Sequence, residues 1–144
     1  MLNIEESTVI KRPVAEVFDF VSNFENHPKW ESNFQKVKLL TLTPSGVGSI
    51  YQSELKLPGQ TATSTFKITE YEVNKKIAFE GEAAGPAKPK GSFRFEPAAD
   101  GTKITLVPRP EFRGFFKLLE PMMAGYVRKQ NQDHLRKLKS VLEA

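Results

Sequence analysis

Few side chains in this chain could carry out acid–base or metal chemistry. It has no cysteine and only two histidines, His27 and His134, which excludes thiol catalysis, zinc–thiolate sites and histidine-rich metal sites. The two histidines do not lie at metal-ligand spacing, so the sequence predicts no metal and no cofactor. Acid–base catalysis would need a titratable group with a shifted pKa inside a cavity. Its candidates are Tyr51, His134 and Glu54, and no catalytic residue is assigned.

Each histidine also has a structural interpretation, which we favour over a catalytic one. His27 precedes Pro28 in a predicted loop, where it could donate a proton or hydrogen-bond the end of a short helix. His134 lies near the edge of an apolar helix stripe. A half-buried imidazole with satisfied hydrogen bonds is the expected state there.

The aromatic residues indicate binding more strongly than catalysis. The chain has eleven Phe, three Tyr and one Trp, and many of them fall at inward strand positions or on the helix stripe. Core packing explains most of them, but Phe and Met also line ligand cavities, which are mostly apolar with a few polar groups. The Tyr51 and Tyr126 hydroxyls and the Gln130 amide would orient a polar group of a ligand. The predicted cavity-lining residues are Trp30, Tyr51, Phe66, Phe79, Phe93, Met123, Tyr126 and Gln130.

One sheet and one long helix must position these candidates. Residues 2–10 read as a strand, and two short helices follow, over residues 14–21 and within residues 24–34. From Phe34 to Pro108, apolar residues alternate with polar ones in successive short segments. This alternation is typical of an antiparallel meander with one apolar face, and Asp100-Gly101 is a strong hairpin turn signal.

The last third of the chain predicts the helix. Apolar residues recur at helical spacing from Phe112 to Leu142, which describes one broad apolar face. Because proline disrupts a helix interior, we expect Pro121 to begin the main helix, with residues 112–120 as a separate turn. Residues 122–134 are the predicted floor of a cavity, and residues 112–116 and 138–142 are predicted ordinary core. The polar residues Gln130, Asn131 and His134 mark either a ligand contact or the edge of the stripe.

The chain length and the net charge limit the predictions about domain number and partners. A chain of 144 residues suits one domain over 1–144. The net charge is +4, but the clearest basic cluster falls opposite the apolar stripe, so we expect no nucleic-acid partner. No apolar run approaches the roughly 18 residues of a membrane span, and the acidic N-terminus has no apolar signal segment. We therefore expect no stable membrane insertion and a cytoplasmic location, and the sequence assigns no oligomeric state.

Several motifs together resemble a known superfamily. They are IKRPVAEVFDFV at residues 10–21, FENHPKW at 24–30, ITEYEV at 68–73, and FRFEP at 93–97 with Asp100-Gly101-Thr102. The chain resembles the START/Bet v 1-like superfamily, most closely its polyketide cyclase/dehydrase-like branch. The resemblance implies an α+β helix-grip fold, in which a curved antiparallel sheet wraps a long C-terminal helix. It also implies two short helices after the first strand and a hydrophobic cavity between sheet and helix.

The resemblance leaves three functions open. Members bind lipids, polyketides, hormones and other apolar molecules, and some catalyse cyclisation or dehydration. The leading hypothesis is a binding protein for an apolar or aromatic small molecule. A polyketide cyclase/dehydrase-like enzyme is the first alternative. A protein-interaction module is the second, and it predicts a large exposed apolar patch.

Overall fold

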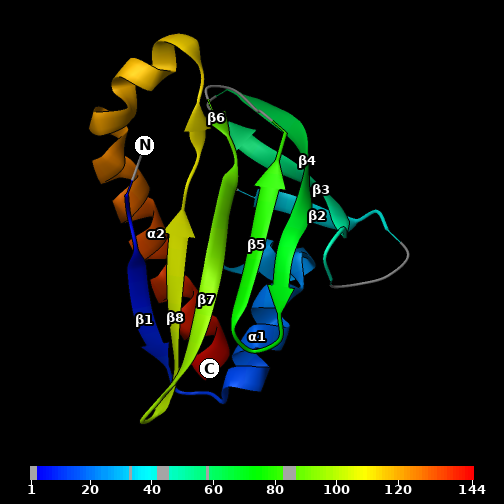
Figure 1. The fold of residues 1–144 in the computed structure, drawn as a ribbon, viewed down its shortest axis with the longest axis vertical. Coiled ribbons are helices and arrows are strands. Elements are labelled where there is room, and N and C mark those ends of the chain that lie inside the picture. The colour runs from blue at the N-terminus through cyan, green and yellow to red at the C-terminus, as the bar shows by residue number, and fades with distance from the viewer. Residues whose placement is uncertain (1–2, 33, 42–45, 58, 83–86) are drawn as a thin grey trace.

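The computed structural model describes residues 3–32, 34–41, 46–57, 59–82 and 87–144. A curved sheet of seven antiparallel strands, in the order β1-β8-β7-β5-β4-β3-β2, lies against a long C-terminal helix, α2 (Glu120–Glu143) (Figure 1). Its strands are β1 (Glu6–Ile10), β2 (Phe34–Leu39), β3 (Ile50–Leu57), β4 (Gln60–Glu72), β5 (Lys76–Gly81), β7 (Lys90–Ala98) and β8 (Gly101–Pro108). This architecture is the α+β helix-grip fold that the sequence predicts.

Strand alternation separates the two faces of the sheet. Tyr51 pairs with Phe66 across β3 and β4, and Ile77 pairs with Phe93 across β5 and β7. All four side chains are buried on the inner face. The neighbouring positions carry exposed charges, such as Arg94 beside Phe93. Successive residues of a strand point to opposite faces, so the sheet has one apolar side and one charged side.

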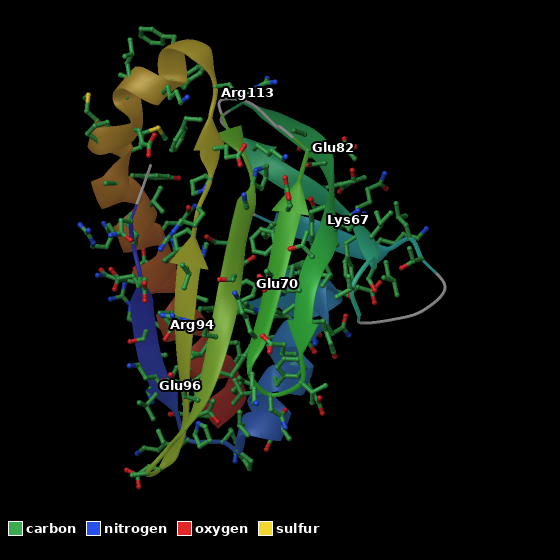
Figure 2. All side chains as sticks on the ribbon, in the orientation of Figure 1. Lys67, Glu70, Glu82, Arg94, Glu96 and Arg113 are labelled. Carbon is green, nitrogen blue, oxygen red and sulfur yellow. The ribbon has the colours of Figure 1, made fainter. Side chains whose placement is uncertain are left out.

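The charged side of the sheet faces away from α2. Figure 2 shows Lys67, Glu70, Arg94 and Glu96 on this outer surface, and all four are exposed. Lys76 pairs with Glu70 there, with Nζ 3.1 Å from Oε2. Exposed pairs of this kind add little stability, and their charges keep the outer face in water.

Two short helices follow β1 and cover one end of the sheet. They are α1 (Val14–Ser22) and the 3-10 helix η1 (Phe24–Lys29), as the sequence predicts. Pro13 precedes the first residue of α1, where its missing N–H costs nothing. The strand before α1 packs closely on the β7–β8 hairpin, since a Cβ placed on Gly101 would lie 2.0 Å from the Ile10 carbonyl oxygen. Only glycine allows this approach.

The segment before α2 confirms one expectation and corrects another. Residues 114–119 form a separate 3-10 turn, η2 (Gly114–Leu119), and Pro121 is the second residue of α2. However, Phe115 and Phe116 are 68% and 41% exposed, so the prediction that they belong to the core is wrong. The turn leads them away from the sheet, and among the described residues of η2 none is buried. Phe112, which precedes the turn, is buried as expected.

The buried face of α2 is narrower than its apolar stripe. Met122 and Tyr126 are 78% and 63% exposed, whereas Leu135 and Leu138 are buried in the core. Near the start of α2, the sheet therefore covers only part of the apolar face that the sequence pattern predicts. Within the described part of the chain, α2 and the other helices are too short or too polar to cross a membrane.

A small second sheet was not predicted. It pairs β6 (Ala87–Lys88) with β9 (Glu111–Phe112), placing Ala87 opposite Phe112. Two-residue strands carry no periodicity, so sequence patterns cannot reveal them. This pairing holds Phe112 beside the end of β7 that begins at Lys90.

Candidate functional site

A cavity of about 300 Å³ lies between the inner face of the sheet and α2. Phenylalanine rings dominate its sheet side, and the helix contributes both apolar and polar side chains. Its lining residues are Phe24, His27, Glu31, Phe34, Ser53, Ser64, Phe66, Phe79, Pro89, Lys90, Phe93, Pro108, Pro110, Phe112, Met123, Tyr126, Val127, Gln130, Asn131 and His134.

The apolar wall is an aromatic cluster with few aliphatic fillers. Phe79 stacks on Phe93 with ring centroids 5.7 Å apart, and Phe24 lies within 5.2 Å of Phe66. These rings come from three strands and from η1, segments far apart in the sequence. Aromatic pairs at such distances are mutually stabilising, so the wall can stay ordered around an open space.

Small residues explain why the space is open. Ser53 and Ser64 face each other across β3 and β4 on the inner face, where larger side chains would fill the interior. The Ser53 hydroxyl donates to the Ser64 carbonyl at 3.3 Å, so its polar group is satisfied by the backbone. Gly91 lies opposite Phe79 on the adjacent strand. The small serine side chains leave a hollow between the rings and the helix, whereas Gly91 allows the Phe79 ring to pack closely on the adjacent strand.

The helix side of the cavity follows α-helical spacing. Met123, Val127, Gln130, Asn131 and His134 recur at intervals of three or four residues, so they share one face of α2. The Asn131 side chain donates to the Val127 carbonyl at 2.8 Å. The sequence left open whether the polar break in the stripe is a cavity contact or an edge. All three polar residues of that break line the cavity.

A buried polar cluster forms one part of the lining. His27 is 2% exposed and Glu31 is 9% exposed. The imidazole lies between two acceptors, with Nε2 2.9 Å from the Val21 carbonyl oxygen and Nδ1 3.1 Å from Oε2 of Glu31. Val21 is in the last turn of α1. His27 therefore hydrogen-bonds the end of a short helix, which is the interpretation favoured from the sequence.

This geometry requires His27 and Glu31 to share a proton. The Val21 carbonyl can only accept, so Nε2 of His27 carries a hydrogen. Nδ1 then faces a carboxyl oxygen, and two lone pairs would repel unless a second hydrogen lies between them. Either an imidazolium faces a carboxylate, or a neutral imidazole faces a carboxylic acid. In both cases the pair has no net charge.

His134 differs from the half-buried, satisfied histidine expected from the sequence. It is 6% exposed, and its Nε2 has no hydrogen-bond partner among the described residues. Burial lowers the pKa of His134 below its ordinary value of 6.5. The Glu31 carboxyl opposes this shift and His27 adds to it. His134 is therefore a neutral imidazole near pH 7, with a buried nitrogen left unsatisfied.

The predicted lining residues separate into two groups. Phe66, Phe79, Phe93, Met123, Tyr126 and Gln130 all border the cavity. Trp30 and Tyr51 are each 1% exposed and pack in the core beside it, outside its lining. Tyr51 stacks on Phe24 at 5.3 Å, so its ring supports the aromatic wall from behind. Whether the six lining residues contact a ligand stays a prediction.

Sequence reasoning missed the buried pair of His27 and Glu31. Their spacing of four residues was the available signal, since it brings two side chains together on one face of a helical segment. Glu54, a candidate for catalysis, is half-buried and does not line the cavity. Among the described residues, no group of three or more His, Asp or Glu side chains could hold a metal ion.

Known structures share this fold across nearly the whole chain. The aromatase/cyclase Zhui from Streptomyces sp. R1128 is 13% identical, with a TM-score of 0.78 over 98% of this chain and 93% of that one. A START superfamily protein from Mycobacterium smegmatis is 13% identical, with a TM-score of 0.76 over 99% and 98% of the two chains. Ara h 8.0201 is 18% identical, with a TM-score of 0.73 over 97% and 96%. At these identities the likeness establishes the fold alone.

Sequence comparison defines the family. No curated protein matches the chain. The family model described as "Polyketide cyclase / dehydrase and lipid transport" matches residues 1–143, the span that contains the sheet, both short helices and the helix lining the cavity. A match over almost the full length, on the fold that these structures share, means that the chain belongs to this family of polyketide cyclase/dehydrase and lipid-transport proteins.

Proposed function

We propose that this protein binds a small apolar or aromatic molecule in the cavity between the sheet and α2. The observation that carries the proposal is a hollow of about 300 Å³ walled by phenylalanine rings, with a few buried polar groups. Ligand cavities generally have this composition and start near this size. Membership of a family described by polyketide and lipid handling supports the same function.

The cavity volume limits the size of the ligand. At about 20 Å³ per non-hydrogen atom in close packing, the cavity accepts roughly fifteen such atoms, as in a two-ring aromatic molecule. A ligand that buries about 250 Å² of apolar surface gains about 6 kcal/mol before the cost of association is subtracted. Longer ligands would extend past Tyr126, which lines the cavity and is also exposed.

A cavity-filling variant tests the proposal. The half-buried Val127 lines the cavity, and Val127→Trp adds about 90 Å³ of side chain there, a large part of the free volume. Lys129→Trp is the matched control, because Lys129 is exposed on the same helix and does not line the cavity. A mixed library of lipids and small aromatics is incubated with each protein, and retained compounds are identified by native mass spectrometry.

We expect wild type and Lys129→Trp to retain the same compounds, and Val127→Trp to bind them at least about 10-fold more weakly. Retention of no compound by the wild-type protein would refute the proposal. Equal retention by Val127→Trp would place binding outside the cavity.

Acid–base catalysis in the same cavity is a second candidate function. The observation that favours it is a neutral His134 lining the same hollow as Glu31, whose proton is shared with His27. In a dehydration, His134 would take the proton next to a carbonyl. The shared proton would then leave with the departing hydroxyl as water, forming a carbon–carbon double bond. A β-hydroxy ketone probe tests this: catalysis gives the enone with loss of water, whereas a binding protein returns the probe unchanged.

A further inference from the structure

We infer that this protein docks on the surface of an anionic lipid membrane through an exposed apolar patch at the start of α2. Five large apolar side chains, here called the η2 patch, lie in one short segment of the chain, and each is 41–78% exposed. They are Phe115, Phe116, Leu118, Met122 and Tyr126. The segment forms the end of the molecule at the top of Figure 1.

The five side chains form one surface. The rings of Phe115 and Phe116 have their centroids 6.0 Å apart. Met122 and Tyr126 are four residues apart on one face of α2, and Leu118 precedes Met122 by the same spacing. None of the described residues of η2 is buried, so the turn adds no side chain to the core. A contiguous exposed apolar surface of this kind usually marks a site of interaction.

Two cationic side chains lie beside these apolar ones. Arg113 immediately precedes η2, where Figure 2 shows it, and Lys117 lies within the turn. Both are exposed, and neither forms an ion pair with a described residue, whereas Lys90 and Arg94 are each paired with a glutamate. Glu120, the acidic residue of the same segment, is half-buried. The η2 patch therefore presents positive charge together with apolar surface.

The area and charge of the η2 patch favour a lipid surface over a protein partner. At roughly 100 Å² of exposed surface for each side chain, the patch offers about 500 Å². A stable protein interface buries about 800 Å² on each partner. A symmetric dimer would also bring Arg113 and Lys117 of two copies together, and like charges repel. At a membrane, Phe, Leu, Met and Tyr side chains enter the headgroup region while Lys and Arg contact anionic lipids.

The position of the η2 patch places a docked membrane beside the cavity. Tyr126 belongs to the patch and also lines the cavity, and Met123, which follows Met122, lines it too. Docking of this kind leaves the patch among the lipid headgroups without crossing the bilayer. It goes beyond the proposed function, because it does not require that the cavity hold a ligand.

Vesicle binding tests the inference on the full chain with no ligand added. Vesicles of phosphatidylcholine alone are compared with equimolar vesicles of phosphatidylcholine and phosphatidylglycerol, and bound protein is measured by co-sedimentation at low and high salt. One double variant, Phe115→Ser with Leu118→Ser, removes apolar surface from the η2 patch. A second, Arg113→Gln with Lys117→Gln, removes the two positive charges.

Each double variant has a matched control elsewhere on the surface. Val47→Ser with Val73→Ser removes two apolar side chains that are 70% and 65% exposed outside the patch. Lys36→Gln with Lys38→Gln removes two exposed positive charges from the edge strand β2. The second control has the same net charge as the variant of Arg113 and Lys117, so it separates the position of the charges from their number.

We expect wild type to bind the mixed vesicles at least about 10-fold more tightly than the neutral ones, since each Lys or Arg near an anionic surface contributes about 5-fold. Removing the charges of Arg113 and Lys117 should abolish most of this difference and leave binding to neutral vesicles within about 2-fold. Removing Phe115 and Leu118 should weaken binding to both kinds of vesicle by about 10-fold. High salt should weaken binding to the mixed vesicles, and both controls should behave as wild type.

Several outcomes would overturn the inference. If wild type does not bind the mixed vesicles, the η2 patch is left to an acidic protein partner. If either control weakens binding as much as its matched variant, binding depends on general surface properties. A wild-type dimer in sedimentation equilibrium that Phe115→Ser with Leu118→Ser dissociates would assign the patch to a second copy. The comparison of vesicles on wild type remains decisive if a variant does not fold, and failure of docking leaves the proposed function standing.

Discussion

Removing the His27 side chain should destabilise the fold more than any exposed substitution near it. The imidazole is 2% exposed, stacks on Phe24 with ring centroids 4.1 Å apart, and engages both Val21 and Glu31. In His27→Ala the Val21 carbonyl and the Glu31 carboxyl both lose their partner, and the ring leaves a void. The change therefore combines lost hydrogen bonds, lost packing and an uncompensated buried acid.

The size of the effect follows from these contacts. Breaking a buried pair by removing one partner costs about 3–5 kcal/mol. A lost neutral hydrogen bond alone would cost about 1 kcal/mol. Because these contributions overlap, we expect about 3–5 kcal/mol in total. For a chain of this length each kcal/mol lowers Tm by about 2–4 °C, so Tm should fall by roughly 6–20 °C.

Glu31→Gln provides the matched comparison. The glutamine amide can donate to Nδ1 of a neutral His27, so the variant keeps the contact and should cost clearly less than His27→Ala. Ser32→Ala, at an exposed neighbouring position, should change stability by less than about 0.5 kcal/mol. Urea unfolding followed by circular dichroism measures all three variants. A cost below about 1 kcal/mol for His27→Ala would refute the reasoning, as would an equal cost for Glu31→Gln.

Three further predictions follow from other parts of the fold. Because burial lowers the pKa of His134, the unfolded chain takes up a proton there before the folded one does. The contribution of the neutral His134 side chain to the free energy of unfolding should be complete above pH 6.5 and should be lost as the pH falls toward the lower pKa of the folded state. Urea unfolding midpoints measured across this pH range should show the loss in wild type and lack it in His134→Phe. Replacing the exposed Phe115 and Leu118 together by serine should change the free energy of unfolding by less than about 1 kcal/mol, whereas a larger loss would mean that η2 packs in the folded state. Gly101→Ala should cost at least about 1–3 kcal/mol in thermal unfolding, because its Cβ would overlap the Ile10 carbonyl, and an unchanged Tm would contradict this contact.

Most of the fold could be predicted because its signals are local. Alternation in β4 and β7 and helical spacing in α2 each reflect which face of one element is buried. Pro121 marked the start of α2 because proline removes a backbone hydrogen bond of the helix and clashes with the preceding turn, effects that depend only on neighbouring residues. The prediction failed for Phe115 and Phe116, since apolar spacing cannot tell a helix face that meets the sheet from a turn that extends past it.

The candidate site was only partly predictable for a different reason. Strand alternation predicts which side chains point inward, so Phe79 and Phe93, which border the cavity, could be identified from the sequence. Trp30 and Tyr51 also point inward, but they pack behind the wall, and direction alone does not distinguish these two positions. The protonation of His27 and Glu31 depends on the Val21 carbonyl, a backbone group whose position no side-chain pattern encodes.

The sequence by itself determined the order of the main strands and helices, the inward face of the strands and the family to which the chain belongs. These follow from periodicity, proline and turn chemistry, and a set of motifs spread over the whole chain. Only the tertiary structure decided that a hollow of about 300 Å³ remains inside, and that His134 lies near His27 and Glu31. The volume of a cavity is the small difference between the space that the elements enclose and the side chains that fill it. That difference depends on how distant segments pack, which local patterns do not specify.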